Sequence, residues 1–169
     1  MKEILDENSI KRSLYRISHE IIERNKGVED LVLIGIKTRG ETLANRLCDV
    51  IESIEGVRVP TASLDIAYWR DDNKRKYGEA PTLDIEIKDK IVVLVDDVLF
   101  RGRTVRAAMD GVMFFGRARQ IQLMILIDRG HKELPVRADF VGKNVPTSID
   151  EDVKVNLIEN DGKDAVYIV

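Results

Sequence analysis

Three apolar runs along the chain have the length and composition of buried β-strands. They occupy residues 31–36, 92–95 and 120–127. An unbroken run of this kind is typical of a strand in a parallel sheet that is covered by other elements on both faces. The hydrophobic pattern therefore predicts an α/β protein with a mostly parallel central sheet.

Around these runs, apolar residues recur every three or four positions, which indicates amphipathic helices. The predicted helices run from Ser9 to about Asn25, from the residues after Gly40 to about Ile54, and from the residues after Thr104 to near Gly116. Ser9 is expected to cap the first helix, with a glycine just beyond its end as a stop. Strands that alternate with helices imply right-handed crossovers and place a site at the carboxyl edge of the sheet.

The remaining segments carry weaker patterns. Residues 63–68 alternate and predict a strand, and residues 153–157 and 165–169 predict a terminal hairpin. We expect residues 1–8 to form an arm and residues 132–148 to be loop-like, since the latter are basic and contain two prolines.

Residues 70–84 are charged and show no periodicity, which predicts a mobile loop. Two interpretations are open for this loop. It is either an ordinary exposed hairpin or a lid that closes over a reactive phosphate ester and excludes water.

Composition limits the class of protein. A chain of 169 residues predicts one domain, 1–169, and 44% hydrophobic with 34% charged residues fits a soluble globular protein. A formal net charge of −3 gives no general support to nucleic-acid binding, so such a site would need a local basic patch. Cys48 is the only cysteine, which excludes an internal disulfide. With no apolar run long enough to span a membrane and no leader pattern, we expect a cytoplasmic protein.

Candidate chemistry begins where the second apolar run ends. Residues 92–104 combine a buried strand, the adjacent carboxylates Asp96 and Asp97, a turn with Gly102, and Thr104 before a helix. Each piece alone occurs in unrelated α/β proteins, but their order and spacing form a specific signal. The loop amides and the helix N-terminus suit a phosphate, and the carboxylates suit ribose hydroxyls or a magnesium ion.

A second loop of this kind follows the first apolar run. Lys37, Thr38, Arg39 and Gly40 stand between a strand and a helix, a setting that suits an anion. Taken alone, this loop would be a basic surface turn. The second phosphate-type loop later in the chain strengthens the binding interpretation.

Basic residues also line one side of the first predicted helix. Arg12, Arg16 and His19 lie opposite its apolar stripe. From this stretch alone we favour a plain solvated face, because Glu23 joins it and dilutes the charge.

The stretch 92–104 resembles the phosphoribosyl pyrophosphate (PRPP) motif of type I phosphoribosyltransferases. It departs from that motif at Arg101, where the family usually has a small hydroxyl residue or glycine. Residues 23–27, 35–40, 68–72 and above all 128–148 closely resemble a narrower group within that family. Its members regulate bacterial pyrimidine operons and also act as uracil phosphoribosyltransferases. The resemblance covers nearly the whole chain.

The resemblance implies a type I phosphoribosyltransferase fold, with a small hood and a C-terminal hairpin, and the Mg²⁺-dependent conversion of uracil and PRPP to UMP and pyrophosphate. The catalytic positions it implies are Asp96, Asp97 and Arg70, the last in the lid, and the two aspartates would also hold Mg²⁺, directly or through water. The implied pyrophosphate loop is Lys37, Thr38, Arg39 and Gly40. The implied 5′-phosphate cradle is Leu99, Phe100, Arg101, Gly102, Arg103 and Thr104. The implied border of the uracil pocket is Arg129, Val136 and Arg137.

The resemblance also implies binding to a stem-loop in leader mRNA, more tightly with uridine nucleotides such as UMP or UTP, and assembly as a homodimer or homotetramer. The matching RNA-facing positions are Arg16, His19, His131, Lys132, Arg137 and Lys143. This raises the weight of the basic stripe on the first helix. Tyr15 and Lys132 depart from the family, where a small hydroxyl residue and arginine are usual.

Three hypotheses follow. The first is an attenuation regulator that retains uracil phosphoribosyltransferase activity. The second is a nucleotide-sensing RNA-binding regulator with little catalysis, because Arg101 is bulky and crowds the phosphate loop. The third is a phosphoribosyltransferase for another base, without an RNA role.

Overall fold

A five-stranded parallel sheet forms the centre of the protein, whose computed structural model describes residues 1–71 and 81–169. The strand order is β3-β2-β4-β5-β6, and every neighbouring pair is parallel. The strands are β2 (Leu31–Ile36), β3 (Thr61–Leu64), β4 (Ile91–Leu99), β5 (Gln120–Asp128) and β6 (Phe140–Asn144). The predicted α/β architecture is confirmed.

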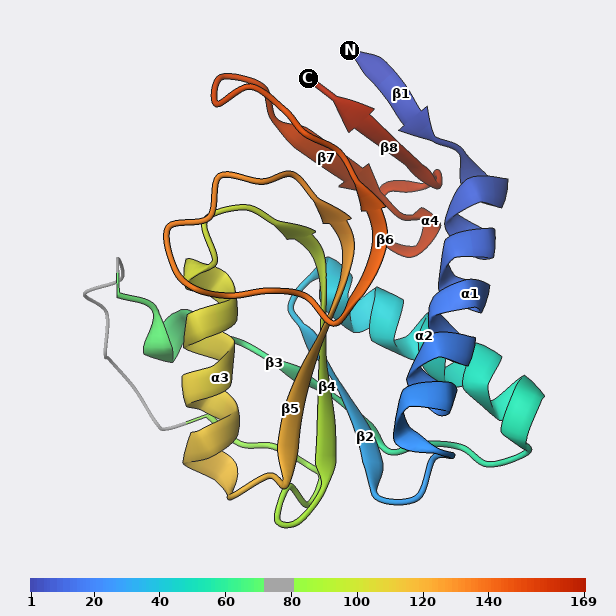
Figure 1. Cartoon of the computed structure of the whole chain (residues 1–169), viewed down its shortest axis with the longest axis vertical. Helices are drawn as coiled ribbons and strands as arrows, with labels where there is room; N and C mark the ends of the chain where they lie inside the picture. Colours follow the sequence, from blue (N-terminus) through green and yellow to red (C-terminus); the bar gives the residue numbers. More distant parts are fainter. Residues whose placement is uncertain (72–80) are drawn as a thin grey trace.

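Helices cover both faces of this sheet (Figure 1). One face packs against α1 (Glu7–Asn25) and α2 (Arg39–Glu55), and the other against α3 (Arg103–Phe115) and the 3₁₀ turn η1 (Ala67–Trp69). Alternate residues of β4 enter the two cores, Val93 on the α1 side and Val92 on the α3 side. This two-sided burial explains the unbroken apolar run. Among the described helices, none is long and apolar enough to cross a membrane.

A second, antiparallel sheet lies beyond the carboxyl edge of the central sheet and forms the hood (Figure 1). Its order is β1-β8-β7, with β1 (Lys2–Leu5), β7 (Val153–Asn156) and β8 (Ala165–Ile168). The terminal hairpin is thus confirmed, although its connection contains the helical turn α4 (Ile158–Asp161). The expected arm at residues 1–8 is wrong, because β1 pairs with β8 and the first helix already begins at Glu7.

The first helix is capped by Asp6 and not by Ser9. The Asp6 carboxylate accepts the backbone N–H of Ser9 at 2.8 Å. Aspartate and serine are both good N-cap residues. Asp6 is the cap here because β1 ends at Leu5 and the helix begins directly afterwards, at Glu7.

Two other sequence predictions are wrong in part. The strand expected over 63–68 ends at Leu64, because the Asp65 carboxylate accepts the N–H of Ala67 at 3.0 Å and the chain turns into η1. The loop expected over 132–148 contains β6, an edge strand that pairs with β5. Its polar residues Lys143 and Asn144 hide the strand from a search for apolar alternation.

Candidate active site

Three loops meet at one edge of the central sheet because β2, β4 and β5 are parallel neighbours. They are the residues 37–40 after β2, the residues 99–104 at the end of β4, and the residues 128–131 at the end of β5. In the pairing of β4 with β5, Leu99 lies beside Asp128. The structure therefore brings together the predicted pyrophosphate loop, carboxylate pair and 5′-phosphate loop.

The loop before α3 forms a small pocket that suits an anion. Gly102 caps the helix with φ 92°, a left-handed conformation that glycine adopts without strain. The first backbone N–H groups of a helix have no acceptor within the helix, so they are available to a phosphate. The pocket has a volume of about 200 Å³ and is lined by Arg70, Val98, Leu99, Phe100, Arg101, Gly102, Arg103, Thr104 and Val105.

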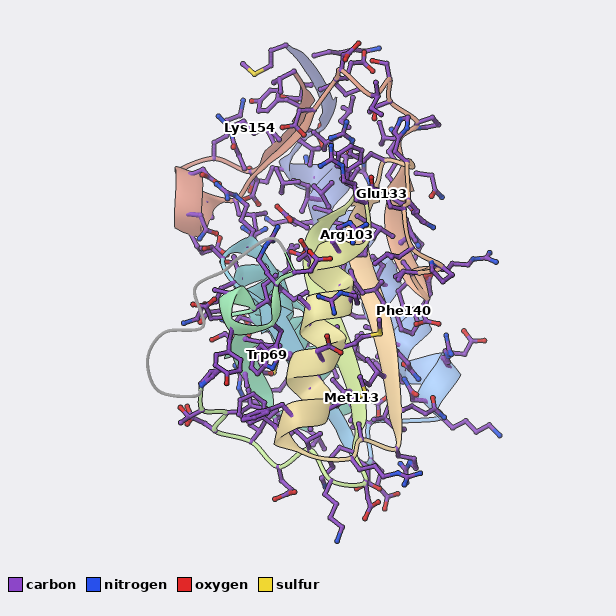
Figure 2. All side chains as sticks on the ribbon, turned by 90° about the vertical axis from the view of Figure 1, so that its left-hand side faces the viewer. Trp69, Arg103, Met113, Glu133, Phe140 and Lys154 are labelled. Atoms are coloured by element: carbon purple, nitrogen blue, oxygen red, sulfur yellow. The ribbon has the colours of Figure 1, made fainter. Side chains whose placement is uncertain are left out.

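Three arginines line this pocket, and two of them, Arg103 and Arg70, contact polar side chains. Arg103 forms ion pairs with Asp71 at 2.7 Å and with Glu133 at 3.0 Å, and Figure 2 shows Arg103 and Glu133 close together at one end of α3. Arg70 Nη1 lies 3.4 Å from Thr104 Oγ1, which connects the start of the predicted lid to the phosphate loop. Most of that lid, residues 72–80, lies outside the described residues.

The carboxylate pair lies within β4, since the strand continues to Leu99. Asp96 is buried, and its Oδ1 accepts the N–H of Asp97 at 2.9 Å. Burial first, and the neighbouring Asp97 carboxylate second, raise the pKa of Asp96 well above its ordinary value. Asp97 is half-buried and presents the more accessible carboxylate of the two.

This donor set fits magnesium that arrives with a phosphorylated substrate. Within the part of the chain that the structure describes, no three His, Cys, Asp or Glu side chains gather as a metal site. Mg²⁺ commonly takes only one or two carboxylates and completes its shell with water and substrate phosphates. Asp96 and Asp97 supply carboxylates of this kind beside a phosphate-binding loop.

The loop after β2 is packed tightly against β4. A Cβ atom on Gly40 would lie 2.3 Å from the carbonyl oxygen of Val95, so only glycine fits there. The Lys37 side chain is exposed, and the Lys37–Thr38 peptide is cis. Arg39 instead donates to Asp161 of the hood at 2.6 and 3.1 Å. Of the two predicted cations, Lys37 is therefore exposed, whereas Arg39 forms an ion pair that bridges α2 and the hood.

The residues predicted to border uracil fall into different settings. Val136 lies beside the phosphate loop, its side chain 3.7 Å from a Cβ built on Gly102, whereas Arg137 is exposed. Arg129 is 3% exposed and donates to Thr147 Oγ1 at 3.1 Å, to Asp152 Oδ1 at 2.8 Å and to the Glu151 carbonyl. Its guanidinium is thus directed into the loop 147–152.

Sequence reasoning missed the acidic partners of this site. Glu133 and Asp161 hold Arg103 and Arg39 respectively. No local pattern reveals such pairs, because Arg39 and Asp161 are 122 positions apart in the sequence.

Several of the predicted RNA-facing residues lie near β6, which packs against α1 and pairs with β5. A hollow of about 440 Å³ is lined by Leu5, Ser9, Arg12, Ser13, Arg16, Gly142 and Lys143. Arg16 there donates to the carbonyls of Val141 at 3.1 Å and Gly142 at 2.8 Å, and to Glu20 at 2.9 Å. Arg16 therefore attaches α1 to β6, while Lys143 remains exposed.

A second hollow, of about 460 Å³, is lined by residues 128–132 and by Asn144, Pro146 and Thr147, and so includes His131 and Lys132. His131 Nε2 is hydrogen-bonded to the Thr147 carbonyl at 2.6 Å, and Lys132 lies 3.5 Å from Asp128. His19 is exposed on α1, with its ring centroid 4.7 Å from that of Tyr15. Of the predicted RNA-facing residues, Arg16 and Lys143 thus line one hollow, while His131 and Lys132 line the other.

Comparison with known proteins identifies the family. The model of the phosphoribosyl transferase domain matches residues 1–156. The bifunctional protein PyrR of Clostridioides difficile (strain 630) is 56% identical over 170 residues, which cover 98% of this chain and 96% of that protein. The protein of the same name from Leuconostoc mesenteroides subsp. mesenteroides is 53% identical over 171 residues, which cover 99% and 98%.

Solved structures share the fold at low sequence identity. The hypoxanthine phosphoribosyltransferase of Trypanosoma cruzi superposes with a TM-score of 0.75 at 16% identity, covering 99% of this chain and 95% of that one. A hypoxanthine phosphoribosyltransferase from Staphylococcus aureus gives a TM-score of 0.70 at 18% identity, covering 98% and 91%. With the phosphate loop, the carboxylate pair and the parallel sheet in place, this chain belongs to the phosphoribosyl transferase family, within its PyrR group.

Proposed function

We propose that this protein is a uridine-nucleotide-dependent, RNA-binding regulator of pyrimidine operon expression by transcription attenuation, and that it also converts uracil and PRPP to UMP and pyrophosphate. The observation that carries the proposal is the meeting of the 37–40 loop, the Asp96–Asp97 pair and the 99–104 loop at one sheet edge. The "bifunctional" name of relatives 56% identical to this chain favours two activities over a regulator with little catalysis.

The phosphate loop would orient PRPP. Its 5′-phosphate suits the backbone amides at the start of α3 and the Thr104 hydroxyl, which Arg70 approaches from the other side at 3.4 Å. With the phosphate fixed there, the ribose extends toward the end of β4, where Asp96 and Asp97 accept hydrogen bonds from its hydroxyls. This positioning converts an encounter of two molecules into a reaction within one site.

Transfer breaks the bond between ribose C1 and the pyrophosphate oxygen and forms a bond from C1 to a nitrogen of uracil, whose N–H proton passes to the pyrophosphate or to solvent. Positive charge develops on the ribose, and negative charge develops on the leaving pyrophosphate. The carboxylates stabilise the positive charge on the ribose. The backbone amides and Lys37 of the 37–40 loop stabilise the negative charge on the pyrophosphate. Bound Mg²⁺, held by Asp96 and Asp97 directly or through water, would supply further neutralisation of the pyrophosphate. The protein needs no nucleophile of its own for this step.

Uracil would lie against the segment that follows the third loop. Val136 packs beside Gly102 and supplies an apolar wall next to the phosphate loop. Arg129 contributes indirectly, since its guanidinium holds the loop 147–152. Arg137 is exposed and belongs equally to the proposed RNA surface.

The proposed RNA surface runs from α1 across β6 to the 128–132 segment. It would bind a leader mRNA stem-loop, in the cytoplasm, through Arg16, His19, His131, Lys132, Arg137 and Lys143. Exposed cations suit phosphate contacts, and a folded RNA loop can be recognised by shape and by bases that leave the stack. The net charge of −3 makes a local surface of this kind necessary.

Self-association is a further part of the proposal. The exposed apolar side chains Met113 and Phe114 at the end of α3 are 60% and 52% accessible. Such side chains suit a contact between copies in a homodimer or homotetramer. Light scattering coupled to size-exclusion chromatography determines the stoichiometry directly.

Enzyme assays and RNA binding test the two activities separately. We expect uracil-dependent release of pyrophosphate from PRPP with Mg²⁺, and a loss of this release of at least about a hundredfold in Asp97→Asn. We also expect UMP to increase the affinity for leader RNA in a gel-shift assay. A parent protein that neither releases pyrophosphate nor binds UMP at millimolar concentration would refute the proposal.

A further inference from the structure

The phosphate pocket carries an uncompensated positive charge at Arg101. Of the described residues that line the pocket, none carries a carboxylate and three are arginines. Arg103 is paired with Asp71 and Glu133. Among the described residues, the Arg101 side chain has no acidic partner, and its guanidinium lies over the Phe100 ring, with Cζ 4.9 Å from the ring centroid.

The contact with Phe100 leaves the donors of Arg101 available. A cation above an aromatic ring is attracted by the charge distribution of the ring and uses no hydrogen-bond acceptor. The five N–H groups of a guanidinium therefore remain free for an oxyanion. Phe100 also packs against two further side chains. The Cζ of the buried Arg129 lies 3.9 Å from the centroid of the Phe100 ring, and the centroids of the Phe100 and His131 rings are 5.9 Å apart.

The pocket already provides for one phosphate without Arg101. The amides at the start of the thirteen-residue helix α3, the Thr104 hydroxyl and the nearby Arg70 together suit a 5′-monophosphate. Arg101 is exposed and belongs to the same pocket lining. An exposed guanidinium in the pocket lining suits phosphates that extend beyond the first one.

We infer that Arg101 is a specificity-determining residue that binds the second and third phosphates of a uridine nucleotide, so that this protein prefers UDP and UTP to UMP. The inference rests on the proposed function, because it assigns the ligand of the same site. A guanidinium suits this role because it can bind phosphate oxygens in pairs.

The test compares dissociation constants of UMP, UDP and UTP by isothermal titration calorimetry at constant free Mg²⁺. For Arg101→Thr we expect UTP affinity to fall about tenfold and UMP affinity to fall less than about threefold, as one charged hydrogen-bonded contact predicts. Arg101→Lys should give an intermediate loss for UTP. The matched control is Arg117→Thr, an exposed arginine beyond the opposite end of α3.

The outcomes separate the inference from the proposed function. Equal losses of UMP and UTP affinity, or no loss of either, would overturn the inference and leave the function intact. Unchanged nucleotide affinities with weaker leader RNA binding would overturn it as well and assign Arg101 to the RNA surface. Failure of the parent protein to bind any uridine nucleotide would overturn the proposed function itself.

Discussion

The Arg129 guanidinium lies 3.9 Å from the centre of the Phe100 ring, which joins the phosphate loop to the segment after β5. The same guanidinium donates to Thr147 and Asp152. One buried side chain therefore connects the 5′-phosphate loop, the loop 147–152 and, through the hydrogen bond of His131 to Thr147, the proposed RNA surface. The proposed nucleotide site and the proposed RNA surface share this structural support.

Arg129→Leu should destabilise the protein strongly. The substitution leaves the Thr147 hydroxyl and the Glu151 carbonyl without their donor, and we expect a loss of about 2–4 kcal/mol in the free energy of unfolding. Urea denaturation measures it. The matched control is Asp152→Asn, because the Asp152 side chain is 74% exposed and the pair should contribute less than about 1 kcal/mol. Equal effects of the two substitutions would contradict this assignment.

The pH dependence of stability should reveal the buried carboxyl group of Asp96. Its pKa is raised, so the folded protein holds this proton more tightly than the unfolded chain does. From the ordinary pKa of 3.8 up to the raised folded value, this group makes the free energy of unfolding fall as pH rises.

Asp96→Asn removes this dependence. The stability of the variant relative to the parent should therefore increase as pH is raised above the ordinary pKa of 3.8, in the absence of ligand. Urea denaturation at several pH values gives the difference directly. A difference that stays constant over this range would show that Asp96 does not titrate in this way.

Gly40→Ala should damage the pyrophosphate loop. The added methyl group would lie 2.3 Å from the Val95 carbonyl oxygen and 3.2 Å from Asp96 Cα, so the loop has to move away from the carboxylates. We expect kcat/KM for PRPP to fall more than about tenfold. The control is Gly56→Ala, which meets no atom within 4 Å and, at φ 74°, should cost about 1–2 kcal/mol in stability while activity is retained. Full activity of Gly40→Ala would refute the role of this close contact.

Lys143 and Arg16 should affect RNA binding in distinguishable ways. Lys143→Gln removes an exposed charge, so the affinity for leader RNA should fall. The slope of log affinity against log salt concentration should decrease by about 1, and the free energy of unfolding should change by less than about 0.5 kcal/mol. Arg16→Gln should lower both RNA affinity and stability, because Arg16 also holds the Val141 and Gly142 carbonyls. Filter binding at several salt concentrations and urea denaturation provide the two readouts.

The matched control for this pair is Arg117→Gln, which changes charge beyond the far end of α3. It should leave both RNA affinity and stability unchanged. An equal loss of RNA affinity in all three variants would indicate a general charge effect rather than a defined surface.

Local patterns predicted the central architecture because each pattern had one physical cause. The unbroken apolar run at 92–95 reflects burial on both faces of β4, and the two phosphate-type loops follow parallel strands, which end at the same edge. The meeting of these loops could therefore be predicted without long-range information.

The remaining features depend on contacts that no local pattern records. β6 escaped prediction because an edge strand containing Gly142 and Lys143 lacks apolar alternation. The ion pair of Arg39 with Asp161 and the burial of the Arg129 guanidinium depend on loops far along the chain. These contacts decide which arginines of the site are available to a ligand.

The pairing of β1 with β8 has a consequence for the order in which the protein forms during synthesis. Lys2 lies opposite Ile168, so β1 leaves the ribosome long before its partner β8 has been made. The five parallel strands, from Leu31 to Asn144, are complete before that point. Because Asp161 of the hood is also the partner of Arg39, the arrangement of charges around the predicted pyrophosphate loop is finished only after α4 has been translated.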